Sequence, residues 1–249
     1  MLPRTIIKAA LRAIGFGIYR IPRAASEVQA GYSYAQAHPN ATLAPWLADR
    51  DFMKTYEAVR DHTLVDVYRL YELWSLVRET AKVGGDIVEV GVWRGGSGCL
   101  MAKQDKLLNG GATVYLCDTF AGVVKASDAD SAYRGGEHRD TDTRMVEGLA
   151  QRLGCDNARL LVGIFPDDTG AQLASRRIRL LHIDVDVFQS AKDSFDHIWE
   201  NMPAGAMVVF DDYGFVGCDG VTRFVDEMRE RTDLLYLNNL NGHAILIKR

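Results

Sequence analysis

Five short apolar runs, all from residue 86 onward, constrain the fold of this chain most. They are DIVEVG (86–91), ATVYLCD (112–118), ARLLVG (158–163), IRLLHID (178–184) and AMVVFDD (206–212). Continuous runs of this length are typical of parallel strands that are buried on both faces. Most of the segments between them are long enough for a crossover helix. The pattern therefore predicts an α/β domain with a mostly parallel sheet and helices on both faces.

The segments before and after the five apolar runs have different patterns. Residues 234–248 read as two strands joined by a tight turn that is rich in Asn and Gly, which predicts an antiparallel hairpin closing the sheet. Residues 53–82 carry apolar side chains at helical period and end at Gly84 and Gly85, which predicts a helix before the first strand.

Composition limits the class of protein. The 249 residues carry a net charge of −4, so no basic excess is available for nucleic acid. The four cysteines are dispersed, without a CxxC pair, as expected of reduced thiols in a cytoplasmic protein. We expect an N-terminal extension over residues 1–50 and one large domain over residues 51–249.

Residues 1–25 combine apolar and basic side chains at roughly helical spacing. The arginine at position 12 interrupts the apolar run and no clear cleavage site follows, so a cleaved signal peptide is not expected. The simpler interpretation is an amphipathic helix that packs on the domain or on a second subunit of a homo-oligomer. The alternative is a helix on an anionic membrane surface, which would make the protein membrane-peripheral.

A long polar connection follows the second predicted strand. Residues 119–148 include SDADSAYRGGEHRDTDTR and few core residues. Long loops in compact domains are often functional, so an active-site lid and a plain surface loop are both open. His138 in this loop could contact a substrate, although a solvated histidine is the simpler interpretation.

The first strand runs into a glycine-bearing loop, VEVGVWRGGSG (88–98). Glycines allow a close backbone approach, and the N-terminus of the next helix offers free N–H groups to an anionic group. The glycine spacing fits neither the dinucleotide fingerprint nor a P-loop. Asp118 ends the second strand, where an acidic residue can accept both hydroxyls of a ribose. Together they suggest a nucleoside ligand, although Asp118 could simply begin a turn.

Four aspartates follow the fourth and fifth predicted strands. Asp184 and Asp186 end one strand, and Asp211 and Asp212 end the next, so parallel neighbours would bring them together. Their carboxylates would repel one another unless some are protonated or a cation lies among them. An all-oxygen set favours Mg²⁺, with Mn²⁺ or Ca²⁺ as substitutes. The alternative is that these aspartates cap helices and bind water.

Five further residues have predicted roles. We expect Ser190 to cap the helix that follows the fourth strand, with Asp193 reaching back. His182 lies inside that strand and is expected to be a hydrogen-bonded core residue. His62 and Tyr56, on the predicted first helix, could line an acceptor pocket or merely pack.

Four segments together resemble the macrocin O-methyltransferase family over residues 53–248. They are DIVEVGVWRGGSGCLMA, LCDTFAGV, HIDVDVFQSAKDSF and PAGAMVVFDDYGFVGCDGVTRFVDEM. The resemblance implies a class I methyltransferase fold of seven strands, S-adenosylmethionine as methyl donor and a divalent cation. It also implies that residues 119–148 cover the substrate. The N-terminal helix has no place in the family pattern.

The resemblance also assigns site residues. Asp184, Asp211 and Asp212 would hold the metal, and Asp184 and Asp186 would be catalytic, with Asp186 the candidate general base. Asp118 would bind the ribose, and Phe165 lies where the adenine is lined. The residues implied to bind the cofactor are Glu89, Gly91, Trp93, Gly95, Ser97, Asp118, Thr119, Phe120, Gly163, Phe165 and Asp184.

The resulting hypothesis is an O-methyltransferase acting on a hydroxyl of a sugar diol in a natural product or glycan. A metal would lower the pKa of the acceptor hydroxyl, and a carboxylate would take its proton. A metal-dependent hydrolase would explain the aspartates but not the glycine loop. A nucleoside-binding scaffold would explain the loop but not the aspartates. The acceptor cannot be read from the sequence.

Overall fold

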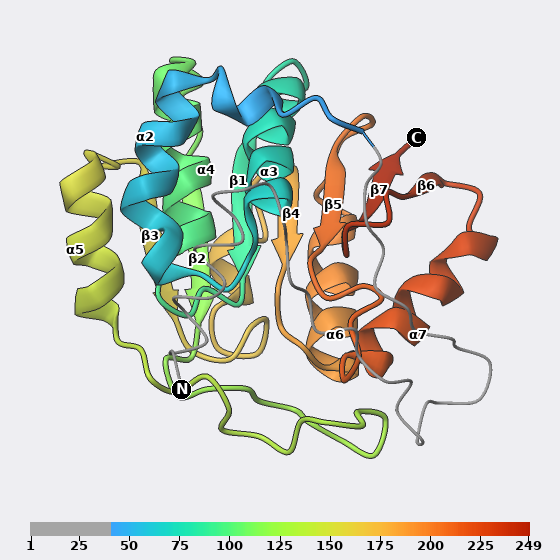
Figure 1. The fold of residues 1–249 in the computed structure, drawn as a ribbon. Coiled ribbons are helices and arrows are strands. Elements are labelled where there is room, and N and C mark those ends of the chain that lie inside the picture. The colour runs from blue at the N-terminus through green and yellow to red at the C-terminus, as the bar shows by residue number, and fades with distance from the viewer. Residues whose placement is uncertain (1–40) are drawn as a thin grey trace, which may run out of the picture. The chain divides into compact units, whose positions relative to one another are not determined.

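The computed structural model describes residues 41–249, which form a seven-stranded sheet in the order β3-β2-β1-β4-β5-β7-β6 (Figure 1). The predicted basic helix near the N-terminus lies outside the described residues. Strands β1 to β5 are parallel, and β7 is antiparallel to both β5 and β6. The predicted parallel sheet with a reversed hairpin is therefore confirmed. The strands are β1 Asp86–Val90, β2 Val114–Asp118, β3 Ala158–Val162, β4 Ile178–Ile183, β5 Met207–Phe210, β6 Leu234–Asn238 and β7 Ala244–Lys248.

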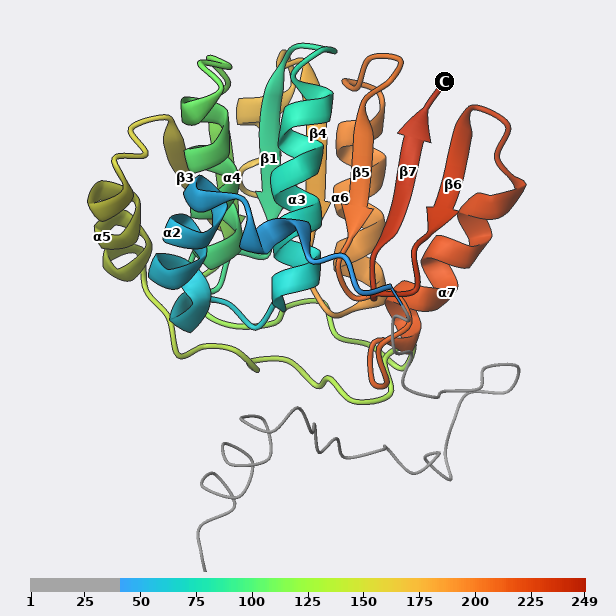
Figure 2. The same cartoon turned by 45° about the horizontal axis from the view of Figure 1, so that its top comes forward.

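Helices cover both faces of the sheet, because alternate strand residues point to opposite sides and both sets are apolar. In β1, Ile87 packs on one side and Val88 on the other. Helices α2, α3, α4 and α5 cover the first face, and α6 and α7 cover the second (Figures 1 and 2). The helices are α2 Arg50–Val59, α3 Val67–Thr80, α4 Gly96–Leu107, α5 Thr143–Leu153, α6 Phe188–Trp199 and α7 Asp219–Glu227.

Four short 3₁₀ helices complete the described elements. Trp46 in the first of them packs edge-on against Tyr68 and Tyr71 of α3. Within residues 41–249, none of the helices combines the length and apolar character needed to cross a bilayer. The 3₁₀ helices are η1 Pro45–Leu47, η2 Arg60–His62, η3 Gly170–Leu173 and η4 Met228–Glu230.

The predicted helix over residues 53–82 is wrong as a single element. The chain forms α2 and α3, separated by η2 and an extended stretch. Helix α3 starts at Val67 because the Asp66 carboxylate accepts hydrogen bonds from the N–H groups of Tyr68 and Arg69. Both helices present apolar side chains to the same core, so the apolar pattern continues across the break and does not reveal it.

Two other predicted boundaries need correction. Helix α6 begins at Phe188, so Ser190 lies within its first turn and is not its cap. The Ser190 hydroxyl donates instead to the carbonyl of Val124 in the long loop, at 3.0 Å. That loop ends earlier than predicted, because Asp142 caps α5 by accepting from the N–H of Met145. The loop therefore spans residues 119–142.

A buried ion pair lies in the core between α4 and the sheet. The guanidinium of Arg179 on β4 donates to the Asp105 carboxylate on α4, and each side chain is 1% exposed. The second oxygen of Asp105 accepts from the N–H of Ala112, at 3.0 Å. Removing one member of a buried pair leaves the other charge without compensation, and this costs far more than losing a surface pair.

We therefore predict that Asp105→Ala lowers the free energy of unfolding by about 3–5 kcal/mol in urea titrations. Asp156→Ala is the matched control, since Asp156 pairs with Lys106 at the end of the same helix but its side chain is 83% exposed. The control should leave the urea midpoint nearly unchanged. Equal midpoints for both variants would contradict the assignment of Asp105 as a buried structural charge.

Candidate active site

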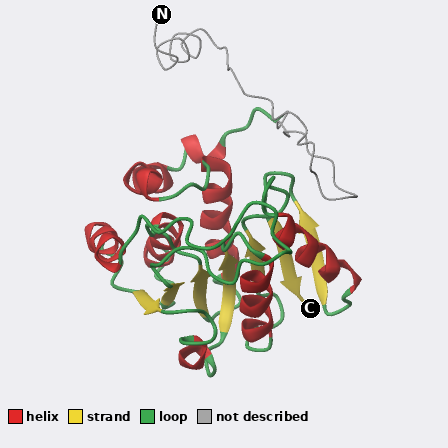
Figure 3. Ribbon diagram, turned by 90° about the horizontal axis from the view of Figure 1, so that it is seen from below, coloured by secondary structure: helices red, strands yellow, loops and turns green. Residues whose placement is uncertain are grey.

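The site lies at the edge of the sheet where the parallel strands end. The winding of the sheet reverses between β1 and β4, and such a switch point is where ligands bind in open α/β sheets. Backbone bonds extend past the strand ends: the N–H of Asp184 donates to Val90, and the N–H of Asp211 donates to Ile183. A cavity of about 350 Å³ opens here. Figure 3 looks onto this edge and shows loops lying across the strand ends.

The glycine loop approaches β4 very closely at Gly91. This residue has φ +88°, and a Cβ atom added to it would lie 1.7 Å from the carbonyl oxygen of Asp184. Only glycine fits such a position. Trp93 of the loop and Ser97 in the first turn of α4 line the cavity together with Gly91. The loop and the aspartates that follow β4 thus border the same space.

Asp118, at the end of β2, holds the glycine loop in place. One carboxylate oxygen accepts from the N–H groups of Val92 and Trp93, at 2.7 and 2.8 Å. The other accepts from the N–H of Phe120, at 2.7 Å. Asp118 also lines the cavity. A carboxylate has about four lone-pair sites, so acceptor capacity remains for a ligand.

Three carboxylates converge on the floor of the cavity. Asp184, Asp211 and Asp212 each bring one oxygen within 4.8 Å of the others. Burial, followed by the charges of neighbouring carboxylates, raises the pKa of Asp184 and of Asp212 well above the usual value. Oδ2 of Asp212 accepts from the N–H of Asp186, at 2.7 Å. Such a group of oxygens has the chemistry of a site for a hard divalent cation.

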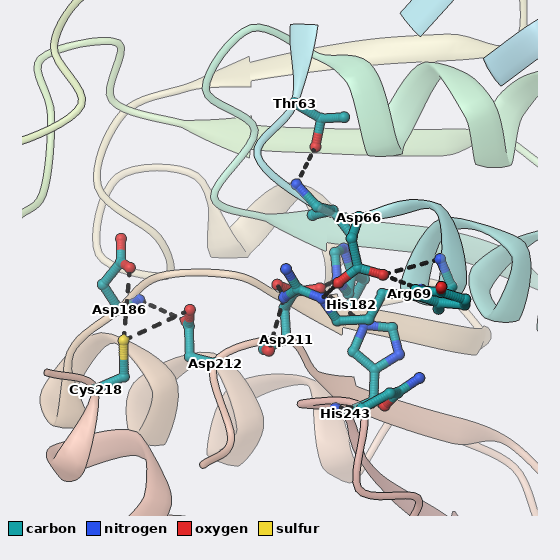
Figure 4. A network of polar contacts seen from close by, with 12 residues as sticks. Thr63, Asp66, Arg69, His182, Asp186, Asp211, Asp212, Cys218 and His243 are labelled. Carbon is teal, nitrogen blue, oxygen red and sulfur yellow. Dashed lines mark hydrogen bonds and ion pairs between the residues drawn. The ribbon is translucent and has the colours of Figure 1, made fainter. Parts of the chain in front are cut away.

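Asp211 differs from its two neighbours because positive groups surround it (Figure 4). Arg69 of α3 forms an ion pair with Oδ2, and His243 Nε2 lies 2.8 Å from Oδ1. Burial alone would raise the pKa of Asp211, but Arg69, His182 and His243 hold it well below its usual value. His182 is fully buried and hydrogen-bonded, as expected. Burial opposes its charge, yet bonds to Asp211 and Glu89 raise the pKa of His182 to about 10.

Asp186 faces the long loop. Its φ is +64°, a strained conformation for a side-chain-bearing residue and one that often marks functional sites. Its carboxylate bonds to the Tyr133 hydroxyl and lies 3.9 Å from His138 Nε2. Burial is the main cause that raises the pKa of Asp186. His138 lines the cavity, and its side chain is 35% exposed.

Most of the predicted site residues come together, and three do not border the cavity. Glu89 is fully buried beneath it, with Oε1 3.0 Å from His182 Nδ1. Gly95 packs beside Val146, and Phe120 packs against the apolar core. The predicted cofactor residues that do line it are Gly91, Trp93, Ser97, Asp118, Thr119, Gly163, Phe165 and Asp184.

Several lining residues were missed in the sequence. Residues 62–65 enter the site because the chain breaks between α2 and α3, so His62 lines the cavity while Tyr56 stacks on Phe52. The capping signal of Asp66 could have revealed this break. Tyr133 and Cys218 come from irregular segments that give no sequence signal. The lining residues that sequence reasoning missed include Thr63, Leu64, Val65, Arg69, Tyr133, Phe215, Val216 and Cys218.

The long loop is tied to the helices beside the cavity. Asp130 is 2% exposed, and its carboxylate accepts from the N–H of Phe188 at the start of α6, at 2.8 Å. A Cβ atom at Gly220 would lie 2.2 Å from this carboxylate, so glycine makes room for it. Lys125 adds ion pairs to Asp167 and Asp193, both at 2.7 Å.

The fold and site define a class I methyltransferase: a seven-stranded sheet with a reversed hairpin, a glycine loop after β1 and an acidic residue after β2. The family model for macrocin O-methyltransferases matches residues 32–246. The chain therefore belongs to the macrocin O-methyltransferase family and is a methyltransferase. The expected resemblance is confirmed.

Curated relatives agree with this assignment. The chain is 29% identical to mycinamicin III 3''-O-methyltransferase of Micromonospora griseorubida over 191 residues, 68% of this chain and 71% of that protein. It is 28% identical to demethyldecarbamoylnovobiocin O-methyltransferase of Streptomyces niveus over 193 residues, 70% of each chain. Both relatives modify natural products, as their names state.

Solved structures share the fold. The O-methyltransferase NovP superposes with a TM-score of 0.65 at 24% identity, covering 75% of this chain and 82% of its own. The calicheamicin methyltransferase CalS11 also gives a TM-score of 0.65, at 17% identity, covering 84% of this chain and 87% of its own. At these identities the structures establish the fold alone.

The contacts of Asp130 generate a prediction about the loop. In Asp130→Ala, the Phe188 amide should exchange its hydrogen about tenfold faster, because a hydrogen bond to a charged carboxylate contributes about 1.5 kcal/mol. Protease cleavage within residues 119–142 should increase. Asp128→Ala, an exposed aspartate of the same loop, is the control. Unchanged Phe188 exchange in Asp130→Ala would show that Asp130 does not tie the loop to α6.

Proposed function

We propose that this protein transfers a methyl group from S-adenosylmethionine to a sugar hydroxyl of a natural product or glycan, with the help of a divalent cation. One observation carries the proposal: a single cavity contains both the glycine loop with Asp118 and the carboxylates Asp184, Asp211 and Asp212. The first set suits a nucleoside with an anionic tail, and the second suits a hard cation.

The donor side of the cavity suits S-adenosylmethionine. Gly91 keeps the β1 loop close to β4, and Asp118 retains acceptor capacity for ribose hydroxyls. Phe165 lines the cavity with only 5% exposure, as an aromatic wall for a base would. The donor supplies a methyl group on a sulfonium, whose departure leaves a neutral thioether. The protein therefore contributes mainly alignment of donor and acceptor.

The side of the cavity that contains Asp184, Asp211 and Asp212 suits a divalent cation, because it offers carboxylate oxygens as ligands. The carboxylate of Asp184 accepts no hydrogen bond from any residue between 41 and 249, so both oxygens are available. Asp212 uses Oδ2 for backbone N–H groups, and its Oδ1 faces only the weak thiol donor of Cys218, at 3.9 Å, among the described residues. Asp211 would share an oxygen that already faces Arg69 or His243. Asp184, Asp211 and Asp212 would hold the cation, which would lower the pKa of an acceptor hydroxyl.

Asp186 is the proposed general base. It borders the cavity two residues after Asp184, and the loop side chains Tyr133 and His138 keep its carboxylate facing that space. A base must lie within hydrogen-bond reach of the proton that it takes. Asp184 is the second candidate for this role, since it borders the same space.

The acceptor side has an apolar mouth. Leu64, Phe215 and Val216 line the cavity and remain 69%, 38% and 54% exposed. Exposed apolar side chains around a pocket mark a surface that an apolar ligand covers. The relatives named above are named for the methylation of mycinamicin III and of demethyldecarbamoylnovobiocin, and these names support a natural-product acceptor with an apolar part. Family membership disfavours both the hydrolase and the scaffold alternatives.

Donor binding can be tested by isothermal titration. We predict micromolar binding of S-adenosylmethionine with or without Mg²⁺. Asp118→Ala should weaken it about tenfold or more, because it removes charge-assisted bonds to the ribose and the support of the loop. Absence of donor binding to the wild-type protein would refute the methyltransferase proposal.

The metal role has a separate test. Asp211→Ala should abolish metal-dependent methyl transfer from labelled donor to vicinal-diol glycosides, while leaving donor affinity within about twofold, since Asp211 is not among the donor-side residues. Excess EDTA should have the same effect on the wild-type protein. Full activity in EDTA would contradict a metal-dependent reaction.

A further inference from the structure

His243 places an imidazole between two carboxylates. Its Nδ1 lies 2.5 Å from Glu72 Oε2 on α3, and its Nε2 lies 2.8 Å from Asp211 Oδ1. The His243 side chain is fully buried, whereas that of Glu72 is 23% exposed. Neither Glu72 nor His243 lines the cavity. Their direct link to the cavity is Asp211, whose Oδ1 lies 2.8 Å from His243 Nε2.

The reversed strand explains how a histidine from the end of the chain reaches this place. In the β5–β7 ladder, Phe210 pairs with Ala244. The residue after Phe210 is Asp211, and the residue before Ala244 is His243, so an antiparallel register sets the two opposite each other. A parallel strand would begin at the other edge of the sheet. The hairpin thus delivers His243 to the carboxyl edge.

The turn of the same hairpin holds the Glu72 carboxylate. The amide groups of Asn239 and Asn241 donate to the two carboxylate oxygens of Glu72. Arg69 lies one helical turn before Glu72 on α3 and pairs with Asp211 Oδ2. Helix α3 therefore reaches Asp211 twice, once directly and once through His243, and fixes both oxygens.

A metal ligand among other carboxylates needs such support. Asp184 and Asp212 repel Asp211, and a free carboxylate would rotate away from them. Groups that hydrogen-bond to a ligand orient it, and their loss typically lowers metal affinity about 10- to 100-fold. We propose that Glu72 and His243 are positioning residues that fix the Asp211 carboxylate for the divalent cation. This inference rests on the proposed function, since it assumes that Asp211 binds a metal.

The test compares Glu72→Met with Glu72→Gln, using Mn²⁺ alone as the probe and electron paramagnetic resonance of free Mn²⁺ to measure binding. Methionine has a similar length but offers no oxygen to His243, so Mn²⁺ affinity should fall about tenfold. Glutamine retains an oxygen acceptor and should restore affinity to within about threefold of wild type. Donor affinity should not change in either variant.

Glu79→Met is the matched control, because Glu79 lies on α3 but its ion-pair partner among residues 41–249 is the exposed Lys82. Its Mn²⁺ affinity should equal that of wild type. Equal Mn²⁺ affinity in Glu72→Met and wild type would overturn the positioning role. Absence of Mn²⁺ binding to the wild-type protein would instead refute the metal part of the proposed function. Glu72→Ala makes the same comparison if the methionine variant does not fold.

Discussion

The charge on Asp211 is the constraint on which the site depends. Asp211 is 3% exposed, and a buried carboxylate requires ion-pair or hydrogen-bond partners. They come from three parts of the chain: Arg69 on α3, His182 on β4 and His243 before β7. Removing any one of these partners would leave the Asp211 carboxylate less well compensated, because the carboxyl groups of Asp184 and Asp212 lie close to it. Helix α3 and the terminal hairpin are thus joined to the end of β5 by polar contacts with Asp211.

The loop after β2 supports Asp186, the proposed base. Asp186 is held in a strained backbone conformation between the floor of the cavity and Tyr133 from that loop. Asp130 fastens the loop to the first turn of α6, two residues beyond Asp186. The loop therefore supports the position of the proposed base, and its residues Val123, Tyr133 and His138 line the cavity. Its polar side chains Lys125 and Asp130 bond to α6, and Ser131 bonds to Asp219 of α7.

Local sequence patterns are sufficient to predict the sheet and the aspartates at its edge. Strand runs are apolar on both faces, and residues at the ends of adjacent parallel strands must converge, so the strand pattern places Asp184, Asp186, Asp211 and Asp212 at one edge. The family resemblance then selects three of the four as metal ligands. It does not identify the break between α2 and α3, because both helices present apolar side chains to one core. Ser190 failed as a cap because capping depends on where a helix begins, which local spacing leaves uncertain by a residue or two.

The sequence by itself determined the fold class, the glycine loop and the acidic edge, since these follow from periodicity and from the parallel direction of the strands. Only the tertiary structure decided which charges meet. Arg69 and Asp211 are 142 residues apart in the chain, and Glu72 and His243 are 171 apart. No local pattern encodes such pairs, because they depend on sheet order, on the reversal of β7 and on the packing of α3. The same packing left Glu89 beneath the cavity and brought Tyr133 and His138 to its wall.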